Sequence, residues 1–424
     1  MYILRLVLIG IIPVLALAVR DKPPQFYIQG FSRIFEGERD FSITMMKQIR
    51  ENHPNKNLFF SPFSTYNALL LAYFASSGQT EQELANVLNL NSAFNKEQVR
   101  SAYTVNKVIH LARFHQSPME LTSVNRIYVD KNVEVIDYFK TVLYDETEPI
   151  DFKNQPAQSL KTINEWIAKK THNQIRDMLS SDEITSRTML VLANAAYMKG
   201  AWLSQFKVEK TTQQPFYIND REQTMVPMMH QSATFKMNID EHLQAQILKL
   251  PYRTKFITKD DQLLTPEDKS DVSMVLILPT SNYNNVNDLI SQLDADSLKT
   301  LVEQSIPREL EVAVPKFQFE QRLVLTPILG NMGINKTFGS GSTFENLTPD
   351  HISIDGAQHM AKIKVDEMGS TAAAATILLA SRSAGRPVPT KFICDHPFVF
   401  IIYDERVHTI LFAGVYSDPR EMEH

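Results

Sequence analysis

The segment 367–383 holds the residues of this chain whose types and order could take part in chemistry. It reads Glu-Met-Gly-Ser-Thr, then four alanines, an aliphatic run, and finally Arg382 followed by a serine. Trypsin-like proteases read an arginine side chain by charge pairing in their specificity pocket. The small residues fit a tight slot, and residues 376–379 suit a β-strand. The segment therefore combines a candidate protease cleavage site with a sequence that could enter a sheet as a strand.

A helix is the competing interpretation of this segment, because alanine is the best helix former. Loop-forming residues stand at both ends, with Gly369 and Ser370 before the alanines and Gly385, Pro387 and Pro389 after them. The hydrophobic pattern also lacks a polar face of helical period. These features favour an exposed loop that ends near residue 390.

The composition is that of a globular protein with a large core. Of 424 residues, 43% are hydrophobic and 21% are charged, and no linker, charge run or internal repeat divides the chain. The net charge of −5 gives no reason to expect nucleic acid as a partner. We expect a single domain over residues 19–424, as a monomer.

Residues 1–18 have the pattern of a secretory signal peptide. Arg5 supplies a positive start, residues 6–15 are apolar, and Ala16-Leu17-Ala18 forms a small-residue cleavage site. The alternative, a membrane anchor, needs a longer apolar run. The sequence therefore predicts a secreted, extracellular protein with no membrane attachment. Two sequons, at Asn335 and Asn346, are then candidate glycosylation sites. Cys394 is the only cysteine, and a buried structural thiol is expected there.

The remaining pattern indicates helices early in the chain and strands later. Helices are expected at 41–50, 63–76, 80–90, 96–114 and 158–170, the third with Thr80 and Glu83 as a capping box. Strands are expected at 58–60, 189–197, 245–250, 272–278, 310–319, 398–403 and 410–416. This order predicts an α+β fold with large, mostly antiparallel sheets.

The common catalytic and metal-binding signatures are missing from the sequence. It contains no glycine-rich nucleotide loop, no His-Glu-x-x-His and no Gly-x-Ser-x-Gly elbow. One cysteine cannot form a cysteine-rich metal site, and the 11 histidines are scattered without ligand spacing. We therefore expect no enzyme activity, no metal and no cofactor, although a Ser-His-Asp triad is not ruled out by sequence.

Five blocks in order, spanning about residues 41–419, resemble the serpin family. They are 57–64 (NLFFSPFS), 192–202 (LANAAYMKGAW), 314–317 (VPKF), 329–334 (LGNMGI), and 396–400 (HPFVF) with 411–414 (LFAG). The sequence Ser-Arg-Ser-Ala within the loop is most similar to the loop sequences of secreted arthropod members. The resemblance implies three β-sheets, about nine helices and an exposed reactive loop at about 367–390. It also implies that a protease cleaves the loop and becomes acyl-linked to it, while the freed strand inserts into the central sheet.

The loop composition agrees with insertion, because alternate side chains of a strand face the core. Ser370, Ala372, Ala374, Thr376, Leu378 and Ala380 would face inward, and all are small or apolar, so their burial costs little. The resemblance assigns the hinge to Glu367, Gly369, Ser370, Thr371, Ala372, Ala373, Ala374 and Ala375. Many inhibitory members have glutamate where this chain has Thr371, which would face outward.

The resemblance also assigns residues that hold the sheet closed. Ser61, Ser64, Asn194 and His359 match a hydrogen-bonded cluster below the point where the sheet must part, and Trp202 with an ion pair between Glu367 and Lys316 marks its top. The plainer interpretation is four satisfied core polar groups. A polar cluster of this kind holds a sheet closed because its hydrogen bonds are costly to leave unmade.

The scissile bond and the partner follow from the loop sequence. In many serpins the cleaved bond follows the seventeenth residue counted from the hinge glutamate, so the resemblance implies Ser383–Ala384. The loop of other members is one residue shorter, which implies Arg382–Ser383, and we favour this bond because arginine offers a charged anchor. Arg386–Pro387 is a third candidate, but the proline would resist cleavage. The expected partner is a trypsin-like, arginine-specific serine protease in a covalent complex.

Three further interpretations of the chain stay open. Basic residues on the helix that binds heparin in some members could take a glycosaminoglycan, although a solvated face is favoured; they are Lys96, Arg100, Lys107, His110 and Arg113. The alternative function is a non-inhibitory serpin acting as a carrier or chaperone, and a third is an unrecognised hydrolase.

Overall fold

The computed structural model describes residues 25–90, 95–115, 117–255, 270–280, 286–339, 341–369 and 390–421. Within these ranges it has nine α-helices and fourteen strands, so the predicted α+β fold is confirmed. None of the described helices is long and apolar enough to cross a membrane.

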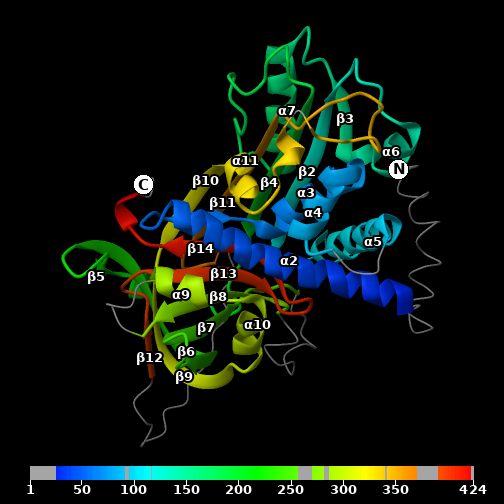
Figure 1. Cartoon of the computed structure of the whole chain (residues 1–424). Helices are drawn as coiled ribbons and strands as arrows, with labels where there is room; N and C mark the ends of the chain where they lie inside the picture. The colour runs from blue at the N-terminus through cyan, green and yellow to red at the C-terminus, as the bar shows by residue number, and fades with distance from the viewer. Residues whose placement is uncertain are drawn as a thin grey trace, which may run out of the picture.

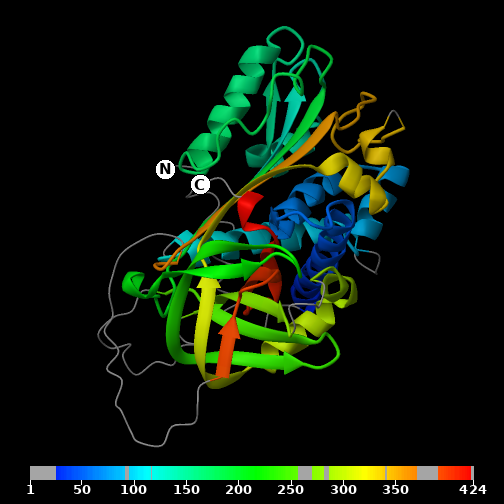
Figure 2. The same cartoon turned by 90° about the vertical axis from the view of Figure 1, so that its left-hand side faces the viewer.

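A five-stranded sheet forms the upper half of the molecule in Figure 1. Its strand order is β10 (Phe317–Val324), β11 (Gly356–Val365), β4 (Leu190–Lys199), β2 (Glu120–Asp130) and β3 (Thr147–Ile150). Helix α7 (Pro156–Lys170) lies on one face, and the blue helices of the N-terminal third lie on the other (Figure 2). Both faces are therefore covered, which explains why β4 is a continuous apolar run.

The second hydrogen-bonded sheet has nine strands and forms the lower half. Its order is β1 (Leu58–Phe60), β14 (Thr409–Tyr416), β13 (Phe398–Asp404), β8 (Val272–Pro279), β7 (Ala245–Pro251), β6 (Gln223–Asp240), β9 (Ile306–Pro315) and β12 (Thr390–Ile393), with β5 (Thr212–Tyr217) also on β6. The 18-residue strand β6 pairs with β5 near its start and with β7 near its end. It thereby joins two of the three expected sheets into one hydrogen-bonded unit.

The helices pack around and between the sheets. Helix α2 (Gln25–Asn52) crosses the middle of the molecule in front of β13 and β14 (Figure 1). Every residue of α3 (Pro62–Ala75) is buried, as a sequence that is apolar nearly all round predicts. The others are α4 (Gly78–Val87), α5 (Lys96–His115), α6 (Asp137–Val142), α9 (Val286–Gln292), α10 (Ala295–Glu303) and α11 (Leu325–Asn331).

Two local predictions were wrong. The single strand expected at 310–319 is two strands, β9 and β10, which separate at Lys316 and lie in different sheets. The capping box at Thr80 is absent, because α4 begins two residues earlier, at Gly78. Glu83 instead accepts bonds from the backbone N–H groups of Asn335 and Lys336, at 2.9 and 2.7 Å.

Candidate functional site: the closed seam and its mouth

The centre of the five-stranded sheet is a parallel pairing of β4 with β11, which we call the seam. It runs from Gly356 opposite Val191 to Lys362 opposite Tyr197. Beyond this point each strand continues for two or three residues, but β4 pairs there only with β2 and β11 only with β10. The two strands therefore separate at the top of the sheet.

Four side chains predicted to act together meet at the seam. His359 on β11 lies directly opposite Asn194 on β4, and their side chains are hydrogen-bonded through His359 Nδ1 and Asn194 Oδ1. Asn194 Nδ2 donates to Ser64 Oγ at 2.6 Å. Ser61 is the N-cap of α3, where its hydroxyl accepts from Ser64 N at 3.1 Å and donates to the Leu411 carbonyl at 2.7 Å. The cluster therefore ties β4, β11, β14 and the start of α3 together.

The hydrogen bonds of His359 fix its protonation state. Its Nε2 accepts from the backbone N–H of Ser61 at 2.9 Å, so in the neutral ring the proton lies on Nδ1 and is donated to Asn194. Burial lowers the pKa of His359 from 6.5 to about 3. A neutral imidazole satisfies both neighbours, whereas a protonated ring would direct a second N–H at Ser61 N–H.

Two polar residues of β2 complete the cluster, and the sequence analysis missed both. Ser123 Oγ lies 2.8 Å from Ser64 Oγ, and the Asn125 amide contacts that of Asn194. Their spacing of two residues puts both on one face of the strand. That alternation within 120–130 was the available signal, but no strand was predicted there.

The top of the sheet, which we call the mouth, is closed by Trp202. Its indole is buried, stacks on Tyr252 with ring centroids 4.4 Å apart, and donates from Nε1 to the Asp366 carbonyl at 3.0 Å. Its backbone N–H donates to the Met368 carbonyl at 3.1 Å. The residues that follow β11 are thus held against the residues that follow β4.

An ion pair fastens the same segment to the neighbouring chain. Lys316 Nζ lies 2.9 Å from Glu367 Oε2, and Thr211 Oγ1 donates to Glu367 Oε1 at 2.7 Å. Burial acts to raise the pKa of Glu367, but the bonds from Lys316 and Thr211 outweigh it and hold that pKa below its usual value. Lys316 occupies the break between β9 and β10, so the break that the sequence did not predict positions this side chain.

Gly369 ends the described part of this segment in a tight turn. Its N–H donates to the Asp366 carbonyl at 3.1 Å, and its carbonyl accepts from Asp366 N at 3.0 Å. Its φ is +109°, and an added Cβ would lie 2.4 Å from the Gly200 carbonyl oxygen and 2.5 Å from Trp202 N. Only glycine fits this conformation and this close approach.

The remaining hinge and reactive-bond residues lie outside the described residues. They are Ser370, Thr371, Ala372, Ala373, Ala374, Ala375, Arg382 and Ser383. Of the two sequon asparagines, both are exposed, but Asn346 Nδ2 donates to the Ser76 carbonyl at 2.6 Å.

A covering layer lies over the seam and was not expected from sequence. Side chains of α7 and of the residues after it, such as Ile167, Met178 and Ile184, form one buried cluster with residues of β4 and with Met360 of β11. At the lower end, Glu183 accepts bonds from Arg322 on β10 and Gln358 on β11. These long-range contacts depend on tertiary packing and leave no local sequence pattern.

The basic residues of α5 are largely neutralised. Carboxylates pair with the four lysine and arginine side chains named above: Lys96 with Glu81, Arg100 with Glu97, Lys107 with Glu146 and Arg113 with Asp404. The pairing favours a structural role for these charges over a polyanion site. Among the described residues, no group of three metal-ligating side chains could hold a metal ion.

Comparison with known proteins agrees with this geometry. The family model for "Serpin (serine protease inhibitor)" matches residues 36–419. The chain is 51% identical over 427 residues to Serine protease inhibitor 88Ea of Drosophila melanogaster, covering all of both chains. It is 29% identical over 402 residues to human Serpin B4, covering 91% of this chain and 99% of the relative.

Solved structures show the same fold. Uncleaved ovalbumin superposes with a TM-score of 0.78 at 22% identity, covering 91% of this chain and 100% of ovalbumin. A crystal structure of maspin gives a TM-score of 0.79 at 24% identity, covering 92% of this chain and 100% of maspin.

Proposed function

Because this chain belongs to the serpin family, we propose that it is a suicide-substrate inhibitor of trypsin-like serine proteases. The protease cleaves the loop at Arg382–Ser383 and remains acyl-linked to it, and the freed strand enters the seam. The path that the described chain takes on leaving β11 is the observation that supports this mechanism most. After Val365 the chain turns back at Gly369, directly at the mouth where β4 and β11 separate.

Strand direction gives insertion its driving force. β4 and β11 are parallel, and a strand that reverses at Gly369 and returns between them would run antiparallel to both. Antiparallel pairs are somewhat more stable per residue than parallel pairs. Insertion would therefore replace one parallel pairing by two antiparallel ones, and would add a further set of backbone hydrogen bonds.

The proposal is tested by incubating the full chain with trypsin and looking for a complex that survives SDS. Arg382→Ala should abolish complex formation, because the specificity pocket then has no cation to pair with. Arg386→Ala is the matched control and should retain it. A complex that persists in Arg382→Ala and disappears in Arg386→Ala would move the bond to Arg386–Pro387, and no complex with any arginine-specific protease would overturn the proposal.

A carrier or chaperone function is the alternative. Members of this kind usually have bulky, charged or proline-containing hinges, whereas residues 369–375 of this chain are glycine, serine, threonine and alanine. The relative from Drosophila melanogaster is named as a serine protease inhibitor. Both features favour inhibition.

Secretion through cleavage after Ala18 and glycosylation belong to the same proposal. Asn335 is exposed and Asn346 is engaged with Ser76, so we expect a glycan first at Asn335. Mass spectrometry of the secreted protein, before and after deglycosylation, measures the mature N-terminus and the occupancy of both asparagines.

A further inference from the structure

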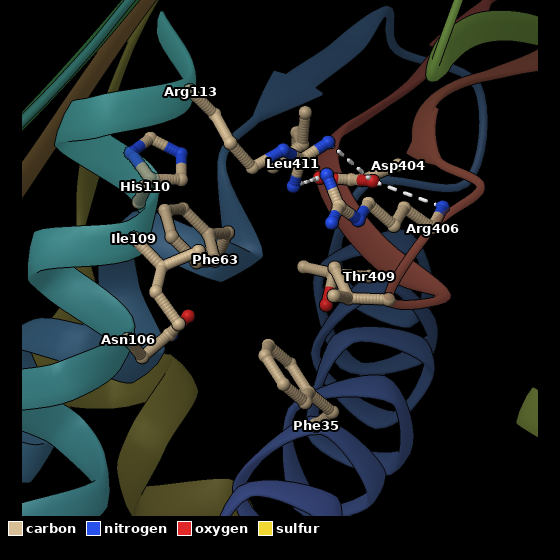
Figure 3. Close-up of a pocket in the computed structure, with 11 residues that line it drawn as sticks. Phe35, Phe63, Asn106, Ile109, His110, Arg113, Asp404, Arg406, Thr409 and Leu411 are labelled. Carbon is tan, nitrogen blue, oxygen red and sulfur yellow. Dashed lines mark hydrogen bonds and ion pairs between the residues drawn. The ribbon is translucent and has the colours of Figure 1, made fainter. Parts of the chain in front are cut away.

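A cavity of about 260 Å³ lies away from the seam, between α2, α5 and the turn that joins β13 to β14 (Figure 3). Its walls are mainly apolar: Phe35 comes from α2, Phe63 from the start of α3, Ile109 from α5 and Leu411 from β14. Figure 3 shows Phe35 and Ile109 on opposite sides of the hollow. Such a lining suits a hydrocarbon group of modest size.

One cation at this cavity has no partner in the described structure. Arg113 is bound at both ends of the Asp404 carboxylate, at 2.6 and 3.1 Å, and lies 3.7 Å from Asp271. Asp271 also pairs with Lys255 at 3.2 Å, so these four charges cancel. The exposed side chain of Arg406 makes no ion pair among the described residues, and only its backbone N–H bonds to Asp404, at 3.1 Å. The cavity therefore has a net positive rim over an apolar interior.

A histidine in the wall adds an unused hydrogen-bonding atom. The Nε2 atom of His110 is buried and has no partner among the described residues. The ring packs between Phe63 and Phe114, with centroids 5.2 and 4.7 Å away. Burial, with a smaller contribution from Arg113, lowers the pKa of His110 to about 4, so the ring is neutral near pH 7. A buried polar atom without a partner is unusual in a folded protein.

We propose that this cavity binds a small amphipathic carboxylate. The carboxylate lies at the rim with Arg406, while the apolar tail packs among Phe35, Phe63 and Ile109. A polyanion would make no favourable contact with the apolar walls. An alkylammonium ion would be repelled by the positive charge of Arg406. The cavity is slightly smaller than typical sites for drug-sized ligands, which favours a short chain.

Octanoate is the probe that tests this proposal, in isothermal titration calorimetry with the full chain. We expect saturable binding at one site, accompanied by a rise in thermal midpoint with octanoate concentration. Octan-1-ol keeps the tail without the charge, and acetate keeps the charge without the tail. Both should bind much more weakly, because each lacks one of the two interactions.

Two variants and one control locate the site. Arg406→Gln should weaken octanoate binding about five- to tenfold, because it removes the one charge at the rim that is unpaired among the described residues. Ile109→Trp should fill the cavity and abolish binding. Arg187→Gln, at an exposed arginine elsewhere in the chain, should change nothing.

The outcomes decide the proposal in either direction. Absence of saturable octanoate binding overturns it, as does equal binding of octan-1-ol or unchanged affinity in Arg406→Gln. If Ile109→Trp does not fold, Arg406→Gln and Arg187→Gln still decide it, because neither side chain is buried.

Discussion

The seam and the mouth hold the same sheet closed with different chemistry. The seam relies on neutral, fully buried hydrogen bonds, above all the one between His359 and Asn194 across the two strands. The mouth relies on the stacked Trp202 and on the ion pair of Glu367 with Lys316, whose side chain is 36% exposed. Breaking a buried polar contact leaves unsatisfied groups at a cost of about 1–3 kcal/mol each. A partly exposed ion pair contributes at most about 1 kcal/mol.

This difference indicates the order in which the sheet opens. The mouth is cheaper to loosen and lies where the returning strand would enter, whereas the seam must lose its cross-strand bond before that strand can pass. We therefore expect seam substitutions to lower the barrier to insertion strongly. Mouth substitutions should have small effects that depend on salt concentration.

The largest effect should come from Asn194→Ala. The substitution leaves His359 Nδ1–H without its partner and removes one bond of Ser64 Oγ, which keeps its contact with Ser123, so it should lower the free energy of unfolding by about 2–3 kcal/mol. The variant should also lose inhibitory activity faster on warming, because its loop inserts spontaneously. Denaturant unfolding and the residual SDS-stable complex measure the two effects.

Asn238→Ala is the matched control for this prediction. Asn238 lies on β6 of the nine-stranded sheet, away from the seam, where its amide donates to the Leu301 carbonyl at 3.4 Å and accepts from the backbone N–H of Ile239 at 2.8 Å. If Asn194→Ala and Asn238→Ala have equal stability and equal inhibitory half-lives, the seam has no special role in holding the sheet closed.

The second effect is a dependence on pH through His359. Its pKa is 6.5 when unfolded and about 3 when folded, so below pH 6.5 the unfolded state binds a proton that the folded state does not. Stability from this group is complete above pH 6.5 and falls as pH is lowered toward 3. Between pH 6.5 and 5 the loss should be about 2 kcal/mol.

A His359→Gln variant isolates that contribution. Its unfolding free energy should change less between pH 6.5 and 5 than that of the parent, since most carboxylates stay ionised in this window. Identical pH slopes for the two proteins would show that His359 is not held neutral.

The smallest effect should come from Glu367→Gln at the mouth. Losing the ion pair should cost about 1 kcal/mol or less at low salt, and the difference should shrink as salt screens the charges. Glu320→Gln is the control, because Glu320 on β10 pairs with Lys362 at 2.6 Å at the upper end of the seam, below residues 366–369 that close the mouth. A faster loss of inhibition in Glu367→Gln than in Glu320→Gln would show that the mouth gates insertion, and equal rates would contradict it.

Local sequence patterns sufficed where an element is buried on all sides. The apolar run at 189–197 predicted β4 to within two residues, and α3, which is apolar nearly all round, was predicted to within one residue. The same kind of pattern misled at 310–319, because one apolar run contains strands of two sheets and only tertiary structure separates them at Lys316.

Some polar residues of the site could be predicted from the sequence, and others could not. The resemblance named Ser61, Ser64, Asn194 and His359, and the structure brings the four together. It gave no sign of Thr211, whose bond to Glu367 joins residues 156 positions apart. Glu183 with Arg322 and Gln358 was also missed, because such contacts arise from packing between distant segments.

The thermal midpoint before and after loop cleavage tests the central claim most directly. If the intact chain is held closed kinetically, as the proposed mechanism requires, a cut mapped within residues 380–386 should let the strand enter the seam and raise the midpoint by roughly 10–20 °C or more. Ala374→Glu, cut at the same bond, should gain far less, because an unpaired carboxylate would have to be buried. A midpoint that stays the same or falls after cleavage of the parent chain would contradict insertion and would favour a carrier whose loop remains outside the sheet.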